Sequence, residues 1–239
     1  MDLIPLYQAT ADGELKQALD AQPELVSEEA AEQAHADFVG ASEAGRADIA
    51  YLAATTGAII RLQLGQREEA LSERFGAAQA LFLLAEDVPA YDNARAEAQE
   101  IGAHAVEIGA LGLVFRCWVQ VADCSWFAFD ADPDDPRPRL MQSMRDCADA
   151  LDWAGRLPDL EEQDNWLERL ASLVSVVSGE AMSRVWSEDL LEADAVMRRL
   201  ARGTEALPVD MAFESTGGVA KTAQVASLLS ELESRYGAP

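Results

Sequence analysis

The chain has 239 residues, of which 49% are hydrophobic and 26% are charged, a composition typical of a folded globular protein. It carries 18 basic and 43 acidic side chains, which gives a formal net charge of −25. This acidic excess argues against a nucleic-acid partner, which needs a basic footprint, and against docking on an anionic membrane.

The cysteine count and the N-terminal sequence predict a cytoplasmic protein. Only three cysteines occur, so there is no paired disulfide framework, and we expect a reducing compartment. The first residues lack the basic start and long apolar run of a secretory signal. Lysine is scarce while Ala, Gly, Leu and Asp are abundant, which is typical of a GC-rich genome, and we expect a bacterial source.

Helix-forming residues dominate the chain and alternating β-branched runs are nearly absent, which predicts an all-α protein. Ser27 is a predicted N-cap, and Gly65 and Gly179 are predicted helix ends. We expect helices at about residues 12–20, 27–43, 46–64, 67–84, 91–108, 111–129, 140–154, 160–177, 181–202 and 219–236.

Residues 130–138 read DADPDDPRP, and their three prolines predict a loop. We interpret residues 1–239 as a single helical domain. A division at this loop, into residues 1–129 and 139–239, is the alternative. The apolar segment 109–129 is long enough to cross a bilayer, but Arg116, Gln120 and Asp123 interrupt its centre, which favours a buried core helix.

One helical hairpin, residues 46–84, resembles a tetratricopeptide repeat (TPR). Its turn reads LGQREEAL over residues 64–71, and Ala70 and Ala77 stand at the spacing of the two small packing positions in the second helix of such a repeat. No second clean copy follows at the period of about 34 residues that the repeat requires. The resemblance implies stacked antiparallel helical hairpins that bind protein, with no catalytic residues to transfer. An irregular helical bundle is the alternative fold.

A polar stripe crosses the apolar segment and is the strongest candidate binding site. Arg116, Gln120 and Asp123 are spaced i, i+4 and i+7, with Trp118 and Trp126 on the same predicted helix. One interpretation is a pocket in which Arg116 receives a carboxylate or phosphate. The other is a structural network in which Arg116 pairs with Asp123 and Gln120 bridges them, because a buried charge needs a partner.

A weaker candidate is a metal site on another predicted helix. Glu100, His104 and Glu107 share one helical face, and carboxylates with imidazole are metal ligands. Charged residues at i, i+3 and i+4 are also ordinary on a solvated helix, so we predict no metal and no cofactor.

The function that these features favour is a non-enzymatic scaffold or adaptor whose acidic surface recognises a basic partner protein or peptide. Residues 1–48 carry eleven acidic side chains against Lys16 and Arg46, and we expect them to form the electrostatic face. The chain shows no recognisable catalytic set, although an enzyme is not excluded. A small-molecule binder or enzyme with a pocket at Arg116, Gln120 and Asp123 is the first alternative, and a metal-binding bundle is the second. Assembly into a homo-oligomer is compatible with all three.

Overall fold

A computed structural model of the chain describes residues 2–132, 136–158 and 163–183, together with residues 196, 199 and 200. The chain divides into two compact units, Met1–Leu113 (unit 1) and Val114–Pro239 (unit 2). The boundary lies upstream of the loop at 130–138, where the sequence suggests a division. Every regular element in the described part of the chain is a helix, as the composition predicts.

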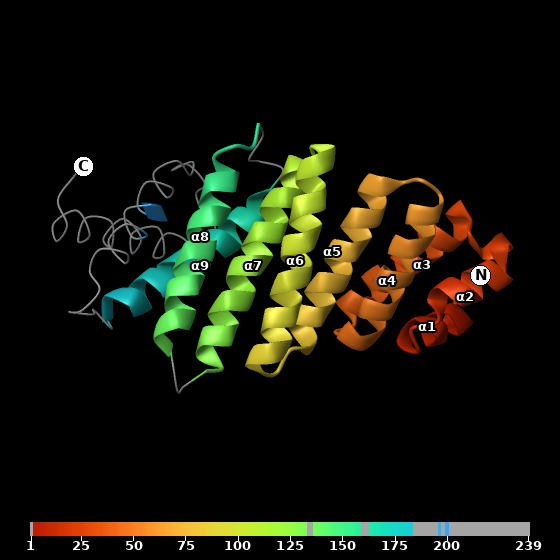
Figure 1. The fold of residues 1–239 in the computed structure, drawn as a ribbon, viewed down its shortest axis with the longest axis horizontal. Coiled ribbons are helices and arrows are strands. Elements are labelled where there is room, and N and C mark those ends of the chain that lie inside the picture. The colour runs from red at the N-terminus through yellow and green to blue at the C-terminus, as the bar shows by residue number, and fades with distance from the viewer. Residues whose placement is uncertain (1, 133–135, 159–162, 184–195, 197–198, 201–239) are drawn as a thin grey trace. The chain divides into compact units, whose positions relative to one another are not determined.

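Unit 1 is an array of stacked helices in which α4 contacts both α3 and α5, and α5 in turn contacts α6 (Figure 1). Its elements are α1 (Ile4–Ala11), α2 (Leu15–Ala21), a short 3₁₀ turn (Pro23–Leu25), α3 (Glu28–Glu43), α4 (Ala47–Gln63), α5 (Arg67–Leu84) and α6 (Val88–Ile108).

The helix ends follow from local chemistry. Ser27 caps α3, its Oγ accepting a hydrogen bond from the Ala30 N–H at 3.3 Å, and Asp87 caps α6 by accepting from the Ala90 N–H at 2.9 Å. Gly65 ends α4 in the left-handed region, with a φ of +81°, where other L-residues are strained. These features confirm the predicted N-cap at Ser27 and the predicted helix end at Gly65.

Small side chains bring the helices of unit 1 close together. Buried alanines occupy the inward faces of α3 to α6, and Ala70 and Ala77 are among them, only 4% and 6% exposed. At Gly76 the approach is closer still, because a Cβ built there would lie 2.8 Å from the ring of Phe38. Alanine and glycine at these positions therefore set the spacing of the stack.

A polar cluster ties α3, α4 and α5 together inside this packing. Glu73, only 5% exposed, accepts a hydrogen bond from Nδ1 of His35 at 2.8 Å, and the Arg61 Nε lies 3.5 Å from the same carboxylate oxygen. Arg61 also donates to Gln66 at 3.1 Å. The carboxylate joins three helices at once, so it fixes their register.

Unit 2 is built on α7 (Leu111–Asp130), α8 (Pro136–Ala154) and α9 (Asp164–Ser183). Their apolar faces form one core, in which Phe115, Leu140, Met144 and Leu170 are fully buried. The segment predicted to be a core helix is thus α7. No helix in the described ranges is long and apolar enough to cross a membrane.

Three sequence predictions need correction. Helix α1 was not predicted from the sequence. Its Pro5 lies in the first turn, where proline is tolerated because the backbone N–H groups of a first turn have no partner within the helix. For the same reason α8 begins at Pro136, inside the segment predicted as loop. Helix α9 runs through Gly179, which was expected to end it. The predicted helix at 219–236 and most of that at 181–202 lie outside the described residues.

Candidate functional site

Unit 1 carries a groove of about 700 Å³ lined by residues of α4, α5 and α6. Helix α5 lies between the other two and contacts both, so it forms the floor and they form the sides. The floor residues that line the groove span Arg67 to Leu81, about 21 Å along the helix at about 1.5 Å per residue. This length matches a helical segment of about 14 residues.

The two sides of the groove differ in chemistry. The α4 side is mostly apolar, with Tyr51, Ala58, Ile59 and Leu62 on its lining face. Leu62 is 59% exposed, a large aliphatic side chain left open to solvent. The α6 side is mostly polar or charged, with the lining residues Asn93, Glu97, His104, Glu107 and Ile108.

An ion-pair network crosses the middle of the groove. The Arg74 guanidinium donates to Glu97 at 2.5 Å through Nη2 and at 3.2 Å through Nε, and to Glu100 at 3.2 Å. Burial by itself lowers the pKa of Arg74, but the hydrogen bonds and charges of the two carboxylates outweigh it and raise the pKa. Arg74 therefore stays charged and fixes α6 against the floor.

Two further charges line the groove without an ion pair among the described residues. Glu107 is exposed near the end of α6, and Arg67 is exposed at the start of α5. Within the described ranges, neither Arg67 nor Glu107 forms a salt bridge. These two side chains are available to a ligand.

The three residues considered as metal ligands are placed on the groove side of α6 but are not assembled as a metal site. Glu100 is engaged by Arg74, while His104 and Glu107 line the groove. Across the described ranges, no group of three or more His, Cys, Asp or Glu side chains is arranged to hold a metal ion.

Two residues of the polar stripe predicted on residues 111–129, Gln120 and Asp123, lie in the interior of unit 2. Gln120 is fully buried and its Nε2 contacts the Cys124 Sγ at 3.6 Å. Asp123 is 5% exposed, and Arg169 of α9 forms an ion pair with it. The predicted Asp123 pairing with Arg116 is thus replaced by one with Arg169, a residue 46 positions away that spacing could not identify.

The remaining members of the stripe are partly accessible. Arg116 is half-buried, and Trp118 and Trp126 pack against the core of unit 2. The Trp126 ring lies 5.2 Å from the Phe129 ring, centroid to centroid. A pocket at this stripe stays a prediction.

Burial raises the pKa of Asp123 to about 6, and the charge and hydrogen bonding of Arg169 reduce this effect only in part. Burial also raises the pKa of the Cys117 thiol to about 12 and that of Cys147 well above its usual value. All three cysteines are free and buried. These thiols are therefore poor nucleophiles.

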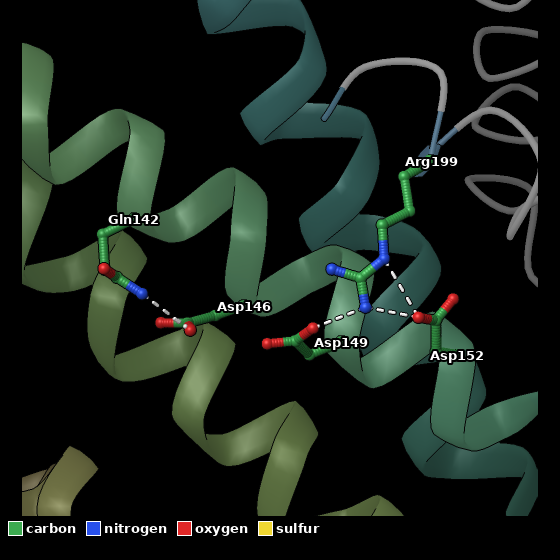
Figure 2. A network of polar contacts seen from close by, with 5 residues as sticks. All are labelled: Gln142, Asp146, Asp149, Asp152 and Arg199. Atoms are coloured by element: carbon green, nitrogen blue, oxygen red, sulfur yellow. Dashed lines mark hydrogen bonds and ion pairs between the residues drawn. The ribbon is translucent and has the colours of Figure 1, made fainter. Parts of the chain in front are cut away.

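Three further aspartates, all on α8, are paired with other side chains of the chain: Asp146, Asp149 and Asp152 (Figure 2). Asp146 accepts from Ser125 at 2.5 Å and from Gln142 at 2.9 Å. Arg199 donates to Asp149 at 2.6 Å and, through Nε, to Asp152 at 3.0 Å. This satisfied network contrasts with the exposed acidic side chains of unit 1.

Sequence reasoning missed the groove itself. The hairpin at 46–84 was singled out for its turn and its alanines, and both α4 and α5 belong to the groove. The signal available was the spacing of Tyr51, Thr55, Ile59 and Leu62 at i, i+4, i+8 and i+11, which places them on one helical face. Residue spacing alone does not show whether a neighbouring helix covers this face of α4, because that depends on how the helices pack.

No protein-family model matches this chain, and no curated protein or solved structure matches it significantly. The fold and the site are therefore interpreted from their own chemistry.

Proposed function

We propose that the chain is a non-enzymatic helical scaffold that binds a partner protein with a basic surface through unit 1. A TPR-like arrangement of the stack is part of this proposal. It is supported by the turn at residues 64–71 and by the burial of Ala70 and Ala77.

One observation carries the proposal, namely the exposed acidic excess of unit 1. Residues 1–113 contain 20 acidic and six basic side chains, and 16 of the acidic ones are exposed. Basic side chains of this unit are already engaged by its own carboxylates: Arg46 pairs with Asp48, Arg61 with Glu73, and Arg74 with Glu97 and Glu100. Uncompensated carboxylates on a rigid stack attract a positively charged protein and orient its approach.

The test is a pull-down from native lysate with the full chain as bait, eluted in salt steps from roughly 0.1 to 1 M, over which the screening length falls about threefold. A variant with Glu29, Glu32 and Glu43 changed to Gln tests the acidic surface, since all three side chains are exposed on α3 and the change removes only their charge. We expect bound proteins rich in Lys and Arg, released at lower salt from the variant. Binding that does not change with salt, or captured proteins as acidic as the bait, would overturn the proposal.

A further inference from the structure

The groove of unit 1 has one apolar side and one acidic side, and this asymmetry specifies a kind of ligand. The α4 side presents Tyr51, Ile59 and the open Leu62, and the α6 side presents Glu97 and Glu107. A ligand that fills the groove must bury apolar surface on one side and meet carboxylates on the other. An amphipathic helix with a basic stripe beside its apolar stripe has this pattern.

The dimensions of the groove agree with a helix. From Tyr51 to Leu62 the α4 side covers 12 residues, whose 11 steps at about 1.5 Å each give about 17 Å, or three turns of helix. Two of the six floor residues, Ala70 and Ala77, are small and buried. Small floor residues let a ligand approach the stack closely.

The charged side chains of the groove differ in whether they already have an ion-pair partner. Arg74 already neutralises Glu97 and Glu100, so Glu107 is the carboxylate most open to a ligand cation. Arg67 also lines the floor, and its charge repels a cation placed beside it.

From these features we infer that the groove between α4 and α6 binds an amphipathic helix of about 12–14 residues, with aliphatic side chains against α4 and Lys or Arg side chains toward α6. This inference rests on the proposed function and names the partner segment that the scaffold holds. Burial of the aliphatic side chains supplies affinity, and the Glu107 carboxylate favours a basic partner over an acidic one.

The experiment selects 14-residue peptides of random sequence, displayed on phage, against the full chain. Enriched peptides are then measured by fluorescence anisotropy on the wild type and on matched pairs of variants. Leu62→Glu is paired with Leu83→Glu, which changes a leucine 70% exposed outside the groove lining. Glu107→Lys is paired with Glu168→Lys, since both are exposed glutamates on a helix and Glu168 lies in unit 2, outside the groove lining and outside the acidic surface of unit 1. Circular dichroism checks that each variant is folded.

We expect enriched peptides with aliphatic residues at i, i+3, i+4 and i+7 and with basic residues on an adjacent face. Leu62→Glu should weaken them at least tenfold and Glu107→Lys several-fold, while both controls stay within twofold of the wild type. Basic peptides without apolar periodicity that bind Leu62→Glu as well as the wild type would overturn the inference and leave the proposed function standing. Failure to enrich any peptide would also overturn the inference alone, whereas enrichment of acidic peptides would overturn both.

Discussion

Replacing Asp123 by Asn should stabilise unit 2 at neutral pH. Burial raises the pKa of Asp123 from 3.8 to about 6, so the folded state binds a proton more tightly than the unfolded state does. Between about pH 4 and 6, ionisation of Asp123 therefore lowers the free energy of unfolding as the pH rises. A shift of roughly 2 pKa units corresponds to about 3 kcal/mol at pH 7. Asparagine resembles the neutral acid and avoids this cost, and Arg169 is exposed enough, at 37%, to remain hydrated.

The assay is urea unfolding of the wild type and of Asp123→Asn from pH 4 to 8, followed by tryptophan fluorescence. All five tryptophans lie in unit 2, and Trp118, Trp126, Trp153 and Trp166 pack against its core, so the signal reports this unit. The two proteins should be equally stable near pH 4, and the variant should be more stable by up to about 3 kcal/mol at pH 7.

Asp146→Asn is the matched control, because this buried aspartate accepts hydrogen bonds on both carboxylate oxygens, from Ser125 and from Gln142. An amide keeps only one accepting oxygen, so this variant should lose about 1–3 kcal/mol. An Asp123→Asn variant that is less stable than the wild type at pH 7 would refute the reasoning. It would mean that the ion pair with Arg169 outweighs the desolvation of the carboxylate.

Three other predictions concern packing and chemistry. Glu73→Ala should cost about 3 kcal/mol in thermal or urea unfolding, because it leaves the 14% exposed Arg61 without its carboxylate, and a loss below about 1 kcal/mol would contradict this. Gly40→Ala should stabilise the chain by about 0.5–1 kcal/mol, since nothing lies within 4 Å of the new Cβ. Gly76→Ala should destabilise it by about 1–3 kcal/mol, because the new Cβ clashes with Phe38. A higher melting temperature for Gly76→Ala than for Gly40→Ala would be inconsistent with the packing described. A thiol reagent such as dithionitrobenzoate should modify none of the cysteines in the native protein and all of them in denaturant, and rapid native labelling would disprove the burial of Cys117, Cys124 and Cys147.

Local signals in the sequence identified most of the helices, because caps and breaks act over a few residues. Ser27 and Gly65 did so at the start of α3 and the end of α4. The same reasoning failed at Pro136, which starts a helix where three prolines suggested a loop, and at Gly179, which a helix passes through. A proline or glycine gives a preference, and the packing of the whole unit decides between the outcomes.

The candidate site was harder to predict because it depends on contacts between distant residues. Asp123 could be identified as a charge needing a partner, but the partner Arg169 lies on another helix. The groove likewise depends on α5 lying between α4 and α6, which no residue spacing expresses. Of the residues proposed as metal ligands, His104 and Glu107 do reach a candidate site, but as lining residues of a groove.

Amide hydrogen exchange of the full chain, alone and with the protein recovered by salt elution from lysate, tests the central claim most directly. The account predicts slower exchange on binding in residues 51–62, 67–81 and 93–108, the parts of α4, α5 and α6 that line the groove. Slower exchange confined to residues 116–126 of α7, with α4 to α6 unchanged, would contradict it and would place binding at the polar stripe of unit 2.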